Sequence, residues 1–523
     1  MQLTVLIIFT TLTCLAPFAQ AQDWSRNAPV PADGRPNPYG VKSLPQTVRA
    51  GRLHALNYPV NVTGILLPYA PIKKLLDLEA LQRWLGLPEY PAYEGSGPYQ
   101  IPFLNGTRPA DSMGFSKIKT RNGTGFTVSC AQCHSENLFG RRVLGLTNRF
   151  PQANELFVLS LKARPLIVPE LFQFVTGASD GETNMLRSTL RAMQYVGARK
   201  PVQLGLDTSI AQVAISLAKR EPDAWAERTA PHLPPSNPWL KLVSDSKPAV
   251  WWNVKYKNRW LSDGSVVSGN PIFTNFLWNE IGRGTDLHQL DRWLKQNAGV
   301  VRELTTAVFA SEPPRYTDFF AATDIDETKA RRGEELFNQH CASCHGHYSK
   351  GWDEGASDPA ARLKTTHVNY HAQTFSVDVG TDPGRYLGMK ALTPLNILEI
   401  SKTNGILIEP QKGYVPPPLL GIWARWPYFH NNSAPSLCAV LTRAADRPTH
   451  YWARPALDSR RDFDRVCNGY PQSPVSWNPE YYYDTRRPGL ANAGHDEGIF
   501  LNQGRELLSW TQKLDLIEYL KVL

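Results

Sequence analysis

Two cysteine–histidine motifs of identical spacing are the part of this sequence whose chemistry is easiest to recognise. Both follow the pattern Cys-x-x-Cys-His, which a chain of this composition would contain about 0.002 times by chance. Two thiols at this spacing form thioethers with a haem, and the adjacent histidine becomes the proximal ligand of its iron. We therefore predict two c-type haems, attached through Cys130, Cys133, Cys341 and Cys344 and bound at iron by His134 and His345.

A zinc knuckle or a redox dithiol is the alternative for such a motif. Zinc needs further cysteine or histidine ligands close by. After His134 the next histidine in the chain is His232, so the first motif has no nearby residue to complete a zinc site. The spacing therefore favours haem.

Three cysteines remain outside the two motifs. Cys14 lies in the apolar stretch Leu3–Leu15, which is followed by the small-x-small sequence Ala19-Gln-Ala21. This pattern predicts a signal peptide over residues 1–21, and hence a periplasmic or secreted protein. In an oxidising compartment Cys438 and Cys467 are expected to form a disulfide that closes a loop rich in proline and arginine.

The overall composition is that of a globular protein with long loops. Hydrophobic residues make up 42% and charged residues 20%, and there are 42 prolines and 37 glycines. The net charge of +9 comes from scattered lysines and arginines, which indicates a solvated surface rather than a nucleic-acid partner. After the signal peptide no apolar stretch is long enough to span a membrane.

The elements that must position the motifs differ between the two halves. A helix from Asp326 runs into Cys341, and a second amphipathic helix is predicted over Leu508–Leu523 to pack against it. Turn and strand precede Cys130, residues 186–220 look helical, and residues 22–125 show little helical periodicity. We expect a mainly α protein with two cytochrome c-like haem domains, long irregular loops and small β hairpins, divided into residues 22–315 and 316–523.

Three further segments contain extended sequence patterns. They are Ala330–Phe337 before the second motif, Pro248–Val254 with the later Asp263-Gly264, and Gly421–Ser433, which contains Pro-Tyr-Phe-His-Asn-Asn-Ser. Together they resemble the bacterial diheme cytochrome c peroxidase superfamily, and their order is closest to the long branch that includes the rubber oxygenases. The resemblance implies an oxidoreductase with one reactive haem and one haem that supplies electrons.

Two departures from the peroxidases affect the first haem. Ser262 replaces the tryptophan that peroxidases carry directly before Asp263-Gly264. Peroxidases place a catalytic glutamate shortly after that pair, whereas residues 265–271 of this chain contain no acidic residue. No histidine follows His134 closely, so the first haem is expected to keep an open face. By analogy with the long branch, Val266 and Val267 would line that face, although both could equally be ordinary core residues.

The resemblance also implies a distal ligand for the second haem. The family usually takes a methionine before the last helix, but this chain has none after Met389. His495 stands in the equivalent place and is our first assignment, with His430 as its rival. A tyrosine among residues 481–483 is a further option, because tyrosine also ligates haem.

Two more roles follow from the resemblance. Trp251, Trp252 and Trp260 are candidates for an electron relay between the haems, with Trp252 the strongest and core packing the alternative for each. The family holds a calcium ion between its domains, for which Asn253 and the backbone oxygens of Arg425 and Pro427 would be the ligands.

Three functions fit these features. The first is peroxidase-type reduction of hydrogen peroxide, with electrons from a small periplasmic donor such as a c-type cytochrome or a cupredoxin. The second is a haem-dependent oxygenase that uses dioxygen to cleave an organic substrate such as a polyisoprenoid. The third is an electron-transfer cytochrome without a substrate, which an open iron face disfavours. We place the peroxidase type first as the broader class.

Overall fold

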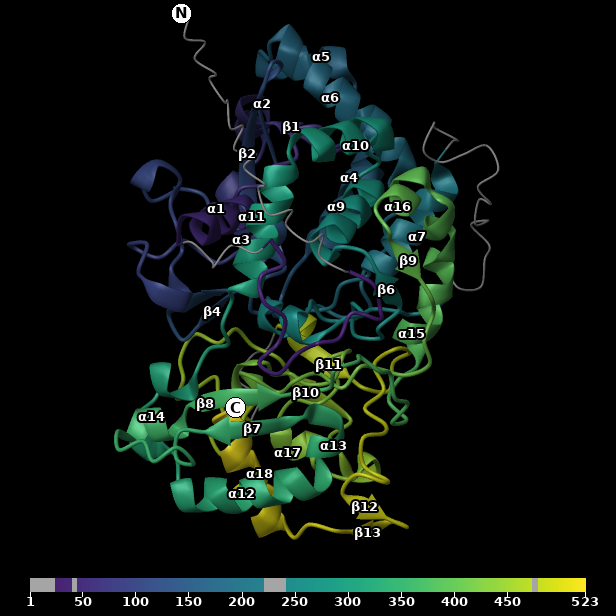
Figure 1. Cartoon of the computed structure of the whole chain (residues 1–523). Coiled ribbons are helices and arrows are strands. Elements are labelled where there is room, and N and C mark those ends of the chain that lie inside the picture. Colours follow the sequence, from purple (N-terminus) through teal and green to yellow (C-terminus); the bar gives the residue numbers. More distant parts are fainter. Residues whose placement is uncertain (1–23, 40–44, 221–240, 473–477) are drawn as a thin grey trace, which may run out of the picture.

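The computed structural model describes residues 24–39, 45–220, 241–472 and 478–523, so the predicted signal peptide lies outside the described residues. The part of the chain before residue 316, called the N-terminal half below, forms the upper part of the molecule in Figure 1. Most of the remainder, the C-terminal half, forms the lower part. None of the helices within these ranges combines the length and the apolar character that crossing a membrane requires.

Most of the longer helices belong to the N-terminal half. They are α1 (Pro45–Leu56), α2 (Tyr69–Leu75), α3 (Leu78–Trp84), α4 (Ala153–Ala163), α5 (Pro169–Thr176), α6 (Asp180–Ala192), α7 (Ser209–Lys219), α9 (Pro271–Gly282), α10 (Leu287–Gln296) and α11 (Ala298–Phe309). The expectation of helix over residues 186–220 is met by the end of α6 and by α7, with an irregular stretch between them.

Helix α1 lies in the region for which the sequence shows little helical periodicity. It packs directly on α11, and a Cβ atom at Gly51 would lie only 2.0 Å from the carbonyl oxygen of Glu303. Ala55 and Leu56 at its end are fully buried. Tertiary packing therefore stabilises a helix that its own apolar pattern does not reveal.

The first motif follows a hairpin of strands β2 (Phe115–Thr120) and β3 (Gly123–Val128), as the predicted turn and strand require. Cys130–Gln132 then forms a single 3₁₀ turn, and a second hairpin of β4 (Ser135–Leu138) and β5 (Arg141–Leu144) leaves the motif. Two hairpins thus hold this motif from both sides.

The second motif lies between helices, as predicted. Helix α12 (Glu327–His340) runs into Cys341, and α18 (Trp510–Lys521) packs across it (Figure 1). Gly333 permits this close approach, because a Cβ there would lie 2.1 Å from the carbonyl oxygen of Asp515. Phe337 and Tyr519 meet at the crossing with ring centres 5.4 Å apart.

The smaller elements of the C-terminal half connect this helix pair to the rest of the molecule. Its helices are α13 (Ala342–His345), α14 (Pro359–Leu363), α15 (Gly384–Gly388), α16 (Glu399–Thr403) and α17 (Leu437–Val440). The remaining strands are β1 (Leu67–Pro68), β6 (Val266–Ser268), β7 (His347–Lys350), β8 (Thr365–Asn369), β9 (Leu407–Ile408), β10 (His450–Trp452), β11 (Tyr482–Asp484), β12 (Leu501–Asn502) and β13 (Arg505–Glu506). The described chain is helix-rich with small sheets, and its division into two haem domains stays a prediction.

Two large apolar clusters form the core. One surrounds α12 and α18, and the other joins α1, α7, α9 and α11. Residues 389–408, which include α16, belong to the second cluster although they follow the second motif in sequence. In Figure 1 this green segment accordingly lies beside α7. A chain segment therefore returns across the predicted boundary at residue 316.

Cys438 and Cys467 form the predicted disulfide, across a sequence separation of 29 residues. A loop of this length implies a chain-entropy contribution of roughly 3–4 kcal/mol. The double variant Cys438→Ala/Cys467→Ala is therefore expected to lose about that much free energy of unfolding in urea, with its haem content unchanged. An unfolding midpoint equal to that of the wild type, at an unchanged slope, would contradict this.

Candidate functional site

A cavity of about 500 Å³ borders both cysteine–histidine motifs. Cys130 and His134 line it from the first motif, and Cys341, Cys344 and His345 line it from the second. Its volume lies in the range of cofactor pockets, about 300–1,000 Å³. None of the four motif cysteines is in a disulfide. The fold therefore brings two motifs that lie far apart in the sequence to one shared cavity.

The first motif is held through its backbone. The carbonyl of His134 accepts a hydrogen bond from the N–H of Gly145 at 2.8 Å, and the carbonyl of Cys133 accepts one from Asn148 at 3.0 Å. Burial lowers the pKa of His134 to about 4 and raises that of Cys130 to about 11. At neutral pH the imidazole is therefore neutral, which is the form that binds a metal.

The second motif orients its histidine with a hydrogen bond. Nδ1–H of His345 donates to the carbonyl of Pro417 at 2.8 Å, which leaves Nε2 as the nitrogen with the free lone pair. The Tyr348 hydroxyl donates to the carbonyl of His345 at 2.7 Å and accepts from the N–H of Leu419 at 2.7 Å. Burial lowers the pKa of His345 to about 4, so this ring too is neutral.

His495 lies opposite His345 across the cavity. The centres of the two imidazole rings are 6.4 Å apart. Two metal–nitrogen bonds of about 2 Å, with half a ring on each side, span about 6 Å. Nδ1 of His495 is buried and has no hydrogen-bond partner within the described residues. The pair therefore has the separation that one shared metal ion requires.

The backbone around His495 is held in an unusual conformation. Its φ is +55°, in the left-handed region that costs a residue with a side chain about 1–3 kcal/mol. Its N–H donates to the carbonyl of Val379 at 2.8 Å, and Nη1 of Arg447 donates to the carbonyl of Gly494 at 2.7 Å. Neighbouring loops thus hold the ring in place against local strain.

His430 also borders the cavity, but its ring is engaged elsewhere. It stacks on Tyr414 with ring centres 4.1 Å apart, and its Nε2 lies 2.9 Å from the Tyr414 hydroxyl. That hydroxyl donates its proton to the carbonyl of Asp382 at 2.6 Å, so it accepts from Nε2–H of His430. The three tyrosines at 481–483 do not line the cavity.

The charges that line the cavity are all of one sign. Lys247, Lys257 and Arg425 border it, and within the described part of the chain no aspartate or glutamate does. None of these three side chains forms an ion pair with a carboxylate of the described residues. Burial and Arg425 lower the pKa of Lys257 to about 8. The cavity lining therefore supplies no counter-charge to this cluster, although Asp263, which does not line the cavity, partly offsets the lowering of the Lys257 pKa.

An apolar wall borders the cavity on the side of the first motif. Val266 belongs to it, whereas Val267 is fully buried on the opposite face of β6 and does not line the cavity. The sequence pattern did not distinguish these two residues. The other large apolar side chains of this wall are Ile272, Phe276, Trp278, Leu304 and Val308.

The three tryptophans of the relay prediction lie in different surroundings. Trp251 lies beside His134, with ring centres 5.8 Å apart, and lines the cavity. Trp252 is completely buried, and its indole N–H donates to the carbonyl of Leu420 at 2.9 Å. Trp260 lines the cavity and donates to the carbonyl of Gly269. Trp251 is thus the nearest of the three to a motif histidine.

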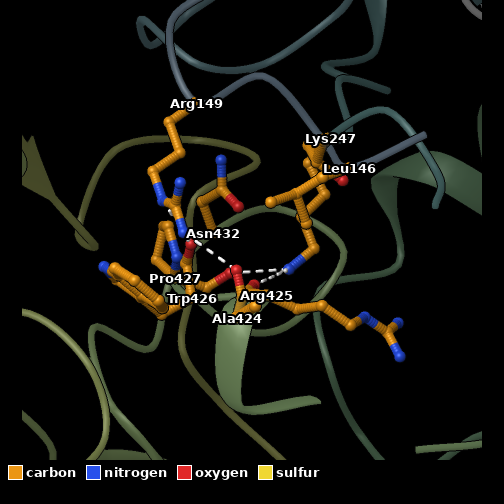
Figure 2. A pocket seen from close by; sticks show the side chains of 9 residues that line it. Leu146, Arg149, Lys247, Ala424, Arg425, Trp426, Pro427 and Asn432 are labelled. Atoms are coloured by element: carbon orange, nitrogen blue, oxygen red, sulfur yellow. Dashed lines mark hydrogen bonds between the residues drawn. The ribbon is translucent and has the colours of Figure 1, made fainter. Parts of the chain in front are cut away.

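The proposed calcium ligands do not converge on an empty site. Nζ of Lys247 donates to the carbonyl oxygens of both Arg425, at 3.1 Å, and Pro427, at 2.6 Å (Figure 2). The side-chain amide of Asn253 donates instead to the carbonyl of Pro418 at 3.1 Å, and its Oδ1 is buried without a partner among the described residues. An amino group therefore occupies the position between the two backbone oxygens.

Residues 413–453 match the model of a family described as RoxA-like, cytochrome c-like. The match relates the chain to RoxA-type cytochromes c and supports a haem cofactor and electron transfer. The matched segment contains Pro417, Arg425 and His430, all of which border the cavity.

Two relatives from Sinorhizobium fredii (strain NBRC 101917 / NGR234) are similar to the chain. The uncharacterized protein y4iM is 28% identical over 375 residues, which cover 68% of this chain and 78% of the relative. The uncharacterized protein y4iJ is 33% identical over 129 residues, which cover 24% of this chain and 20% of that protein. Neither printed name assigns an activity.

Several residues of the site are absent from the sequence interpretation. They are Pro417 and Tyr348 around His345, Arg447 and Val379 around His495, Tyr414 on His430, and the cations Lys247 and Lys257. Most act through backbone carbonyls or stacking, which leave no residue-type pattern in a single sequence. Lys247 had one available signal in the sequence, because it directly precedes Pro248–Val254, one of the three segments that carry the resemblance described above.

Proposed function

We propose that the chain is a haem-dependent oxidoreductase that holds two c-type haems in this cavity. Both Cys-x-x-Cys-His motifs border this one cavity, and that observation carries the proposal. Their histidines are neutral and buried, and their four cysteines are free to form thioethers. Haem supplies the redox chemistry and the coordination positions at iron that the protein side chains lack.

The unpaired cations fit such a cofactor. A buried charge is costly unless an opposite charge neutralises it. Each haem carries two propionate carboxylates, and the cavity presents Lys257 and Arg425 without any carboxylate of the described chain. These two side chains are therefore our candidates to bind propionates.

The two haems are proposed to differ in their distal ligands. His495 is assigned as the second ligand of the haem at His345, because the two rings are 6.4 Å apart. Among the described residues that line the cavity there is no methionine, and the histidines outside the motifs are His340, His430 and His495. The haem at His134 is therefore proposed to keep one open coordination position for a small oxidant.

A series of contacts runs from one motif histidine towards the other and supports electron transfer between the sites. Trp251 lies beside His134, and the indole N–H of the next residue, Trp252, donates a hydrogen bond to the carbonyl of Leu420. Leu420 is three residues beyond Pro417, whose carbonyl orients His345. We propose that this segment passes electrons to the open site, and that a small periplasmic cytochrome or cupredoxin supplies them.

The cavity favours an oxygenase over a peroxidase. Cleavage of peroxide gains about 10²–10⁴-fold from a positioned acid–base group, and no carboxylate of the described chain lines the cavity. The wall near His134 is apolar instead, with Phe276 and Trp278 among its residues. The best-supported function is therefore dioxygen-dependent cleavage of an apolar organic substrate, and peroxide reduction is the second candidate.

Carbon monoxide binding tests the open position. The reduced holoprotein is expected to bind one carbon monoxide per two haems, with the spectral change at the haem of the first motif. A variant that lacks Cys341 and Cys344 should retain this binding, because its remaining haem is the open one. Binding at neither haem, or at both with equal affinity, would contradict the proposed division of roles.

The activity itself is tested by comparing two oxidants. Purified holoprotein is supplied with dioxygen and a polyisoprene or another long alkene, or with hydrogen peroxide and a reduced small cytochrome. We expect oxygen uptake that depends on the alkene, and carbonyl products that mass spectrometry detects. Rapid oxidation of the cytochrome by peroxide, without alkene-dependent oxygen uptake, would instead establish the peroxidase.

A further inference from the structure

The turn at residues 424–427 is bound by two cations from the N-terminal half. Nη2 and Nε of Arg149 donate to the carbonyls of Ala424 at 2.8 Å and Trp426 at 3.0 Å. Lys247 donates to the two carbonyls that alternate with these, as Figure 2 shows. Four consecutive backbone oxygens thus accept hydrogen bonds from only two side chains.

This turn and these cations lie at the junction between the two motifs. Arg149 directly follows Asn148, whose N–H donates to the carbonyl of Cys133 in the first motif. The backbone N–H of Lys247 donates to the carbonyl of His430, three residues beyond the turn. Arg149 therefore connects the segment that contacts the first motif to the 424–427 turn. Lys247 connects the same turn to residues 247–248, where the carbonyl of Pro248 accepts a hydrogen bond from the Thr147 hydroxyl.

The surroundings of Lys247 do not suit a metal ion. Calcium takes six to eight oxygen ligands, usually with carboxylates among them. No carboxylate of the described chain lines the small pocket around Lys247, and the nearby Glu136 is paired with Arg149 at 3.4 Å. Burial, together with the guanidinium groups of Arg425 and Arg149, lowers the pKa of Lys247. The same positive charges oppose a divalent cation.

We propose that Lys247 is a built-in replacement for a metal ion: its amino group, together with Arg149, holds the 424–427 turn against the first motif. Lys247 is in this sense a positioning residue, which keeps the two haem sites at a constant separation without calcium. This role rests on the proposed two-haem site, and it is the same whether the enzyme uses peroxide or dioxygen.

Metal content gives the first test, and it requires no substitution. The wild-type holoprotein is expected to contain no stoichiometric calcium by mass spectrometry. Treatment with EDTA should leave its melting temperature and both haem spectra unchanged. One calcium per chain, or a fall in melting temperature after EDTA that added calcium reverses, would overturn the proposal.

Chemical rescue gives the second test. Lys247→Ala leaves the carbonyls of Arg425 and Pro427 without these donors, and we expect its melting temperature to fall by roughly 2–5 °C. Ethylammonium, which has N–H donors, should restore part of this loss, whereas tetramethylammonium and calcium should not. If ethylammonium does no better than tetramethylammonium, or if calcium restores the melting temperature, the proposal is wrong.

Lys219→Ala is the matched control. The ammonium group of Lys219 also donates a hydrogen bond to a backbone carbonyl, that of Val196 at 2.9 Å. Lys219, however, lies on α7 and does not line the cavity. Its variant should show no rescue by ethylammonium, and the difference between the midpoint potentials of its two haems should stay as in the wild type. In Lys247→Ala that difference should change. If both variants respond equally to ethylammonium and in the difference between their midpoint potentials, Lys247 is an ordinary structural lysine and the proposal is wrong.

Discussion

Replacing Cys341 and Cys344 with alanine is expected to halve the covalent haem content, from two haems per chain to about one. Both thiols of the second motif border the cavity and are free of disulfides, and thioether bonds are the only covalent attachment that this motif offers. Haem staining after denaturing electrophoresis and the pyridine haemochrome assay measure the loss directly. The reciprocal change at Cys130 and Cys133 should remove the other haem.

The disulfide cysteines provide the control for this experiment. Cys438→Ala/Cys467→Ala also removes two cysteines from the C-terminal half, but these two are bonded to each other. This variant should retain two covalent haems per chain. If it loses haem as the motif variant does, or if the motif variant keeps two haems, the assignment of Cys341 and Cys344 is wrong.

Removing the imidazole of His495 is expected to change the iron at the second motif from low spin to high spin, with both haems still attached. Attachment depends on the cysteines, whereas the spin state depends on the two axial ligands. Loss of a nitrogen ligand that favours ferric iron should also raise the midpoint potential of this haem. Electron paramagnetic resonance and absorption spectra of the resting protein report the change.

The strained backbone at His495 calls for two variants rather than one. At a φ of +55° alanine retains the strain, whereas glycine adopts this conformation freely. A high-spin iron in both His495→Ala and His495→Gly therefore reflects the missing ligand and not the backbone. Added imidazole should return His495→Gly to low spin by occupying the vacated space.

His430→Ala is the counter-test for the ligand assignment. The Nε2–H of His430 donates to Tyr414, so removing this ring should leave the iron at the second motif low spin. Retained thermal stability in each variant separates loss of the ligand from loss of packing. If His430→Ala produces the high-spin iron and His495→Ala does not, the two histidines exchange roles.

Features that depend on neighbouring residues were accessible from the sequence. The helix before Cys341 begins at the acidic Asp326, which caps it by accepting the N–H of Lys329, and the last helix continues almost to Leu523. The strand before Cys130, β3, consists of the glycine- and threonine-containing segment Gly123–Val128. Each of these patterns lies within one element, where propensity, capping and periodicity act directly.

Features that depend on neighbours in space were not accessible. Helix α1 is stabilised by the face of α11, and residues 389–408 join a core on the other side of the predicted boundary. The two residues Val266 and Val267 are equivalent in the sequence, yet only the pleat of β6 decides which one borders the cavity. Burial of this kind is a property of the assembled molecule.

By itself, the sequence determined the two Cys-x-x-Cys-His motifs, from which haem attachment is predicted, and the disulfide partners, because covalent chemistry requires particular residue types at particular spacings. Only the tertiary structure decided that His495 faces His345 while His430 is held by Tyr414. Only the tertiary structure, likewise, brought Lys247 onto the oxygens of Arg425 and Pro427. The physical reason is that a ligand pair or an internal cation depends on distances between loops remote in the chain, and these distances arise when the core packs.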